Sequence, residues 1–331
     1  MMNQQPQEVE RKIIAILKVV SQSGEPLGAR VISRRLRVHG IELSERAVRY
    51  HLKLMDERGF TQSVGRDGRL ITQQGLEEVE SALVGDKVGL VASEIELLAY
   101  QADFDVDERR GTVPVNISFF PHGKFKKALD VMREVFKAGI CVSDLVAVAR
   151  EGEMMGGSVV PQGKIGMATV CGIVVNGALL RRGIPVDSKF GGILQMREGR
   201  ALRFVELIHY AGSSLDPSEI FIASRMTCVR KGAKLGNGRI LASFREIPAV
   251  CKLEAEKVVL GLEKAGVGGL IALGEHSKPV CEFPVEVNKV GMILMGGLNP
   301  VAAAVESGIE VESHAMSAVI KLEDLVKVWE L

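Results

Sequence analysis

The sequence predicts an α/β (α+β) fold, with an N-terminal winged helix-turn-helix followed by a duplicated β-α-β-β-α-β domain. Two observations predict this fold. Three amphipathic helical segments and a short β-hairpin follow one another within residues 1–84, and one pattern of strands and helices occurs twice within residues 112–331. The length of 331 residues is sufficient for two or three domains.

The composition is that of an ordinary globular protein, with 47% hydrophobic and 25% charged residues. No apolar run approaches the roughly 18 residues that a membrane span needs. Residues 1–10 lack the apolar centre of a signal peptide, and the five cysteines are scattered singly, which is a poor disulfide framework. We therefore expect a soluble, cytoplasmic protein without a membrane partner.

The N-terminal part begins with three segments whose apolar residues repeat at helical spacing. The expected helices span residues 8–22, 28–37 and 45–58. Ser44 is a favourable N-cap for the third helix. Gly59 can end that helix, because glycine adopts the left-handed conformation easily.

A β-hairpin is expected next. Phe60–Val64 and Arg69–Thr72 are short apolar runs on either side of an Asp-Gly turn, which favours a tight hairpin. This turn puts Arg66 and Arg69 at the tip of the hairpin. The threonine that ends the second run can cap a fourth helix through about Leu83. Three helices and then a basic hairpin are the element order of a winged helix-turn-helix.

Positive charge is concentrated in this N-terminal part. Residues 1–75 contain 13 Lys and Arg against 8 Asp and Glu, whereas residues 76–331 contain 29 against 33. A basic head on a slightly acidic body favours a polyanion, and a helix with a basic face fits the major groove of double-stranded DNA. The expected DNA contacts are Arg34, Arg35, Ser44, Arg46, Arg49, Tyr50, Lys53, Arg66 and Arg69. The alternative is a winged helix that contacts protein, with its arginines solvated.

Residues 85–111 are expected to form a linker that contains a helix. Ser93, Glu94, Ile95 and Glu96 have the spacing of a capping box, which predicts the start of a helix of about ten residues. Residues 103–110 form a charged loop. A plain spacer and a dimer contact are the two open interpretations of this segment.

The remaining sequence is a duplicated unit. Residues 164–194 and 289–319 share nine identities in 31 positions at a constant offset of 125. The two repeats cover about residues 112–198 and 239–322, and each is expected to have the β-α-β-β-α-β order of a ferredoxin-like unit. A pair of such units related by a pseudo-twofold axis forms a cleft, where small ligands often bind.

The sequence contains no catalytic motif. Its nearest approach to a phosphate-binding loop fails, because five residues separate Gly157 from Gly163 where the motif has four, and Ile165 occupies the position of the magnesium-binding Ser or Thr. The six histidines are isolated, and the cysteines lack zinc-site spacing. We expect no enzyme activity, no catalytic residues, no metal and no resident cofactor. An enzyme with an accessory winged helix is the minority alternative.

Glycine-rich turns lead from a strand into a helix in each repeat, at 171–177 and 295–300. The free N–H groups at such helix starts attract anions. A dicarboxylate could combine one of them with a cation such as Lys189, Arg150 or Arg225. The candidate ligand residues are Gly172, Asn176, Lys189, Gly296, Gly297 and Asn299, with Asn299 as an N-cap. The alternative is that these turns serve only a tight fold.

Across nearly its whole length the chain resembles the NrpR family, archaeal transcriptional repressors of nitrogen assimilation. The segments that carry the resemblance are Gly163–Cys171, Gly183–Gly192, Asp216–Phe221 and Gly238–Pro248. These segments are specific to the family, whereas the winged helix is generic.

The resemblance implies an operator-binding homodimer that represses genes of nitrogen fixation and ammonia assimilation. It also implies 2-oxoglutarate as the inducer and one family regulatory domain at 112–331. Some members carry two regulatory domains, so sensing here rests on this domain or on a second NrpR-type protein. We expect an inverted-repeat operator, and an effector that favours the wrong half-site spacing would weaken DNA binding. A regulator of the same build that senses another metabolite is the alternative.

Overall fold

The computed structural model describes residues 4–21, 23, 25–38, 41–81 and 90–331. The chain forms two compact units, one from the first 87 residues and the other from nearly all of the rest. Each unit has its own hydrophobic core. None of the helices in the described ranges combines the length and the apolar character that a bilayer crossing requires.

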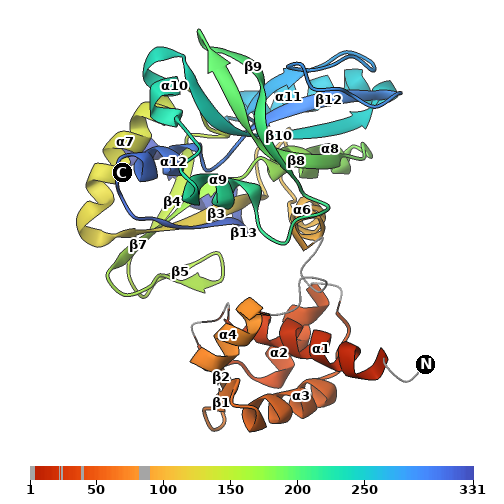
Figure 1. Ribbon diagram of the computed structural model, residues 1–331, viewed down its shortest axis with the longest axis vertical. Helices are drawn as coiled ribbons and strands as arrows, with labels where there is room; N and C mark the ends of the chain where they lie inside the picture. The colour runs from red at the N-terminus through yellow and green to blue at the C-terminus, as the bar shows by residue number, and fades with distance from the viewer. Residues whose placement is uncertain (1–3, 22, 24, 39–40, 82–89) are drawn as a thin grey trace. The chain divides into compact units, whose positions relative to one another are not determined.

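The N-terminal unit is a winged helix-turn-helix, as the sequence predicts (Figure 1). Its elements are α1 (Gln4–Ser21), α2 (Ala29–Val38), α3 (Glu45–Glu57), β1 (Thr61–Ser63), β2 (Arg69–Ile71) and α4 (Gln73–Ser81). The two strands pair antiparallel and form the wing. The helices are held together by a core in which Leu17, Leu36 and Leu52 are buried.

The helix ends in this unit lie where capping residues predict them. Ser44 Oγ accepts a hydrogen bond from the backbone N–H three residues later, at 3.2 Å, and Gly59 follows α3 with a φ of 75°. Thr72 caps α4 in the same way, at 3.0 Å. The expected end of α4 near Leu83 and the expected linker residues 85–89 lie outside the described residues.

The rest of the chain has the predicted duplicated element order, with an additional two-stranded sheet in the first copy that the sequence does not predict (Figure 1). After α6 (Leu90–Gln101), the first copy comprises β3 (Thr112–Pro121), α7 (Phe125–Lys137), β4 (Leu145–Ala149), β5 (Met154–Met155), β6 (Ser158–Val159), β7 (Lys164–Val170), α8 (Ile173–Arg181) and β8 (Asp187–Arg197). Between the copies lie β9 (Arg200–His209), α9 (Pro217–Ala223) and α10 (Val229–Leu235). The second copy comprises β10 (Gly238–Pro248), α11 (Lys252–Lys264), β11 (Leu270–Leu273), β12 (Lys289–Met295), α12 (Asn299–Glu306) and β13 (Glu312–Lys321), and β14 (Val326–Lys327) follows it.

The two copies exchange their last strands. One sheet has the order β13-β3-β7-β4-β14, and the other has the order β11-β12-β10-β8-β9. Strand β8 of the first copy therefore pairs with β10 of the second, and β13 of the second pairs with β3 of the first. The element order alone suggested two separate ferredoxin-like units. The structure differs because hydrophobic periodicity specifies the type of an element and leaves its partner open.

Helices also pair across the copies. Helix α7 packs against α12, and α8 packs against α11. Phe120 and Met132 of the first copy share a buried cluster with Phe244 and Val301 of the second. The exchange of strands and this mixed core make the two copies one interlocked body.

Helix α6 belongs to this body rather than to a free linker. It packs against α8, β3 and β13. A Cβ added to Gly177 of α8 would lie 3.0 Å from Ala99 O and 3.1 Å from Ala102 Cβ, so glycine permits this close approach. The chain is already helical at Leu90, and the capping-box residue Ser93 therefore lies inside the helix, contrary to expectation.

Candidate functional site

Helix α3 presents a basic face to solvent. Its apolar stripe is buried in the core of the N-terminal unit. The opposite side carries four of the predicted DNA contacts, all exposed: Arg46, Arg49, Tyr50 and Lys53. Arg49 pairs with Glu45, and Lys53 Nζ lies 3.9 Å from Glu57 Oε1. Because exposed ion pairs of this kind contribute about 0–1 kcal/mol, both cations can exchange these partners for phosphate.

Three further predicted contacts lie at or before the start of α3. Arg34 is exposed on α2, whereas Arg35 beside it is half-buried. The Ser44 hydroxyl is exposed and accepts the capping hydrogen bond of α3. Ser33 Oγ donates to Leu43 O at 2.6 Å, and this buried hydrogen bond connects α2 to the residue that precedes the N-cap of α3.

The two arginines of the wing have different environments. Arg66 is exposed in the turn between β1 and β2. Arg69 is half-buried, and its Nε donates to Asp56 Oδ2 at 3.1 Å. Thr61 Oγ1 donates to the other oxygen of Asp56 at 2.6 Å. Asp56 thus ties both strands of the wing to α3. The expectation that Arg69 lies at the tip of the hairpin is wrong, because it begins β2 and its guanidinium is held by this carboxylate.

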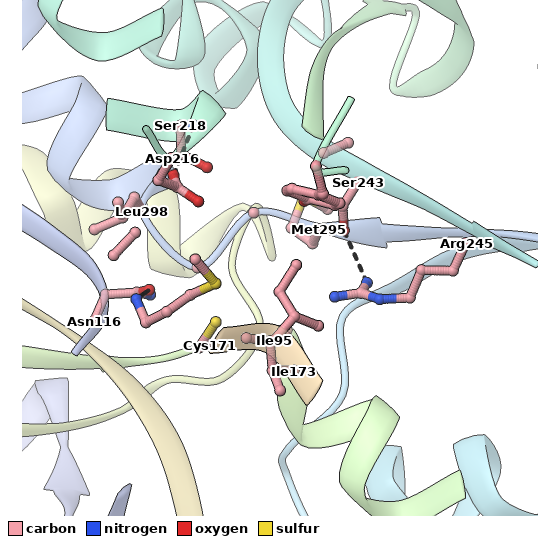
Figure 2. Close-up of a pocket in the computed structure, with 17 residues that line it drawn as sticks. Ile95, Asn116, Cys171, Ile173, Asp216, Ser218, Ser243, Arg245, Met295 and Leu298 are labelled. Atoms are coloured by element: carbon pink, nitrogen blue, oxygen red, sulfur yellow. Dashed lines mark hydrogen bonds between the residues drawn. The ribbon is translucent and has the colours of Figure 1, made fainter. Parts of the chain in front are cut away.

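A small cavity lies where the two copies of the body meet (Figure 2). The turn from β7 into α8 and the turn from β12 into α12 both line it, so equivalent segments of the two copies share one space. The other walls come from β3, β10, β13, α6 and the start of α9. The free volume of about 40 Å³ is room for about three water molecules.

Arg245 reaches this cavity from β10 and is only 2% exposed. Its Nη1 donates to Ser243 Oγ at 2.8 Å, while its Nε is buried without a hydrogen-bond partner. Among the described residues, no carboxylate forms an ion pair with it. In Figure 2 its guanidinium points toward the middle of the site. Burial lowers the pKa of Arg245, yet a guanidinium stays protonated in proteins. A buried cation without an anion is unfavourable, and the arrangement therefore favours an anionic ligand.

The other ionisable groups of the cavity are neutral or already occupied. Burial raises the pKa of Cys171 to about 11, so the thiol is protonated at neutral pH. Burial also raises the pKa of Tyr210. Asp216 Oδ1 accepts the Ser218 N–H at 2.8 Å and caps α9, and burial raises the pKa of this carboxyl. Arg245 is the permanent cation among the described cavity-lining residues.

Three of the six predicted ligand residues line this cavity: Gly172, Gly296 and Gly297. The last two are also required by the packing. A Cβ on Gly296 would lie 2.6 Å from Leu241 Cβ, and a Cβ on Gly297 would lie 2.4 Å from Val170 O. The turns therefore serve the tight fold and at the same time bring backbone groups to the cavity.

The other three predicted residues do not line it. Helix α8 begins at Ile173, so Asn176 lies inside the helix, where its Nδ2 donates to Ser188 Oγ at 3.0 Å. Asn299 is not an N-cap, because its side chain exchanges hydrogen bonds of 2.8 and 2.9 Å with the backbone of Leu241. It fastens α12 to β10.

Lys189 is engaged by carboxylates. Its Nζ lies 2.7 Å from Asp187, 2.6 Å from Glu286 and 3.4 Å from the buried Glu246. Burial opposes its charge, but hydrogen bonds to Asp187 and Glu286 raise the pKa of Lys189 above its usual value. The spacing of these three carboxylates, taken from the described residues, could suit a metal ion. The ammonium of Lys189 already takes the place of such a cation.

The sequence indicates Lys189, Arg150 and Arg225 as candidate cations, and its local patterns do not single out Arg245. Arg150 is exposed, and Arg225 lines a separate groove beside α9. A comparison of equivalent positions in the two copies does single out Arg245. Strand β10 and helix α11 match β3 and α7 at an offset of 127, which aligns Arg245 with Ser118. A charged residue in an apolar strand, at a position that is small in the other copy, indicates a special role.

Two family models match the chain. A model described as NrpR regulatory domains NRD1 and 2 matches residues 88–327, and a model described as the Ribonuclease R winged-helix domain matches residues 14–79. The first of these covers more than half of the chain and contains every wall of the cavity described above.

Curated relatives match over nearly the whole chain. The global nitrogen regulator NrpRI of Methanosarcina mazei is 38% identical over 97% of this chain and 99% of its own length. The global nitrogen regulator NrpR of Methanocaldococcus jannaschii is 32% identical over 97% of this chain, but over only 56% of its own length. A crystal structure of a nitrogen repressor-like protein from Methanococcus jannaschii matches with a TM-score of 0.61 and 30% identity, over 72% of this chain and 98% of that one.

Proposed function

This chain belongs to the NrpR family, and from that premise we propose that it is a DNA-binding repressor of nitrogen-assimilation genes. The observation that carries the proposal is the exposed basic face of α3 on a winged helix, with Arg66 on the adjacent wing. Arg, Lys and Tyr on such a face can contact phosphates and base edges in the major groove. The names of the relatives support nitrogen control as the process that is regulated, with no catalytic role.

The repressor acts as a homodimer on an inverted repeat. Two recognition helices must lie about 34–36 Å apart, or a multiple of that distance, to read both half-sites on one side of the duplex. Nitrogen fixation and ammonia assimilation genes are its targets. These are the functions that membership of the family suggests for a chain of this build.

The effector in this proposal is 2-oxoglutarate, bound in the cavity between the copies. Arg245 supports this assignment, since a buried guanidinium with a free Nε can bind a carboxylate through two hydrogen bonds. The two glycine turns that line the cavity lead into helix starts, whose N–H groups attract anions, although the Gly296 N–H is already donated to Leu241 O. The alternative is that a second NrpR-type protein binds the effector. The Methanocaldococcus jannaschii relative is about twice as long as the segment that this chain matches, which leaves room there for a further domain that this alternative would place on a separate protein.

Effector binding relieves repression by linkage. A ligand shifts the equilibrium between two dimer arrangements only by the difference between its affinities for them. A coupling free energy of about 1–3 kcal/mol lowers operator affinity roughly 5–150-fold.

A gel-shift experiment tests the proposal. The native protein is mixed with a nitrogen-gene promoter, with and without 2-oxoglutarate and a candidate partner, and glutamine serves as the comparison ligand. We expect binding at low salt that weakens when 2-oxoglutarate is added. Arg49→Ala should lose about 1–3 kcal/mol at one base position if Arg49 reads guanine. If both Arg49→Ala and Arg66→Ala bind the operator normally, the assignment of α3 and the wing as the DNA contacts is wrong.

A further inference from the structure

One wall of the cavity is helix α6, which lies outside both five-stranded sheets. Ile95 of α6 lines the cavity directly. Val91, Ile95 and Leu98 are buried in one apolar cluster with Cys171 and Met316, two other residues of the cavity wall. Figure 2 shows Ile95 close to Cys171 and Ile173. A ligand in the cavity would therefore contact α6.

The C-terminal half of α6 is fixed to the body. Ala99 and Ala102 lie so close to Gly177 of α8 that a Cβ on Gly177 would make tight contacts of 3.0 and 3.1 Å with them. Arg181 Nε donates to Ala102 O at 3.1 Å. Thr112, at the start of β3, accepts the N–H of Asp103 at 3.2 Å. These contacts make the C-terminal end of α6 a pivot.

The cavity has to expand to admit a dicarboxylate. Its free volume of about 40 Å³ is room for about three water molecules, and a five-carbon dicarboxylate is larger. Most of its walls are strands, or turns between strand and helix, that are fixed by ladders of hydrogen bonds. Helix α6 contacts this space through apolar side chains, and apolar contacts can slide without breaking a ladder.

We propose that α6 is the element that transmits ligand binding to the winged helix. The inference rests on the proposed function and adds the route of its regulation. A ligand on Arg245 displaces Ile95, and α6 tilts about its fixed C-terminal end. At 1.5 Å per residue its 12 residues are about 18 Å long, so a tilt of about 10° moves its N-terminus by about 3 Å. In the sequence, the N-terminus of α6 is the end that leads to α4, so α6 is the first described helix of the body after the winged helix along the chain.

Two measurements separate the binding of the ligand from its effect on operator affinity. Ile95→Ala shortens the side chain in the wall, and Ile95→Leu is the matched control because it conserves volume. For each full-length variant, calorimetry measures the affinity for 2-oxoglutarate. Fluorescence anisotropy measures operator affinity with and without saturating 2-oxoglutarate. At a 2-oxoglutarate concentration that saturates Ile95→Ala, as set by its own calorimetric affinity, the ligand should change the operator affinity of this variant less than twofold. Ile95→Leu should keep the native response.

Hydrogen exchange gives a second readout on the native protein. Addition of 2-oxoglutarate should change the exchange rates of amides 91–97 in α6 several-fold, while α7 stays unchanged. If the native protein binds the ligand but α6 exchange is unaffected, or if Ile95→Ala keeps the full operator response, α6 is not the transmitter. If the native protein binds no 2-oxoglutarate, the effector part of the proposed function fails and the transmitter role of α6 fails with it. If the native protein does not bind the operator even in the absence of 2-oxoglutarate, the DNA-binding part of the proposed function fails, and the transmitter role of α6 fails with it.

Discussion

Replacement of Arg245 by methionine should stabilise the protein and at the same time abolish its response to the effector. The arginine has one hydrogen bond, to Ser243, and is 2% exposed. Losing a hydrogen bond to a charged group costs about 1.5–3 kcal/mol. Removing a buried charge that has no anion recovers several kcal/mol of desolvation. The net expectation is a gain of about 1–3 kcal/mol in the free energy of unfolding.

The assay uses the single tryptophan of the chain. Trp329 lies in the larger unit, where its Nε1 donates to Asp144 Oδ2 at 3.2 Å, so its fluorescence follows unfolding of that unit in urea. Thermal unfolding should show a rise in Tm of about 2–12 °C, at about 2–4 °C per kcal/mol for a domain of this size. Calorimetry on the same variant should detect no binding of 2-oxoglutarate.

The control is Arg150→Met, which changes an exposed arginine of the same unit. Its unfolding free energy should stay within about 0.5 kcal/mol of the native value, with native ligand affinity. A destabilised Arg245→Met that still binds 2-oxoglutarate would refute the reasoning. In that case water or an unrecognised partner satisfies the guanidinium, and the ligand binds elsewhere.

The two wing arginines should respond differently to alanine. Arg66→Ala should lower affinity for all operators evenly and reduce the salt slope by about one unit. Arg69→Ala should instead lower the stability of the winged helix by about 1–3 kcal/mol in urea unfolding; an unchanged midpoint would contradict its assignment as an anchor. Asn299→Ala should cost about 1–3 kcal/mol, because the buried N–H of Leu241 loses its partner while the Leu241 carbonyl keeps the Gly296 N–H; a loss below 1 kcal/mol would speak against it. Burial raises the pKa of Asp216, so its contribution to stability falls as the pH rises above its ordinary pKa of 3.8. Asp216→Asn should weaken that fall in urea titrations at different pH, and an unchanged pH profile would count against the raised pKa.

Local sequence signals were sufficient for the winged helix. Ser44, Gly59 and the Asp-Gly turn determine where α3 and the wing begin and end, because capping and turn chemistry act between residues close in the sequence. The exposed face of α3 follows from its helical period alone. Arg69 was misplaced because its partner Asp56 lies 13 positions earlier in the chain.

The ligand cavity was only partly predictable. Gly172 and Gly296 were found from turn composition, whereas Lys189 and Asn299 were attributed to it and are engaged elsewhere. A glycine-rich turn before a helix can be predicted locally, because it depends on the conformation of the turn residues themselves. Whether a lysine faces a cavity or a carboxylate depends on residues that the fold brings from distant positions.

The sequence by itself determined the type and order of the elements, the duplication and the basic face of the N-terminal helices. These properties depend on periodicity, capping and charge within short stretches of chain. Only the tertiary structure decided that β8 and β13 change places between the copies, that Ile95 of α6 lines the cavity, and that Arg245 is buried there without an anion. Pairing and burial are set by contacts between residues far apart in the sequence, and local patterns do not encode which distant partner is chosen.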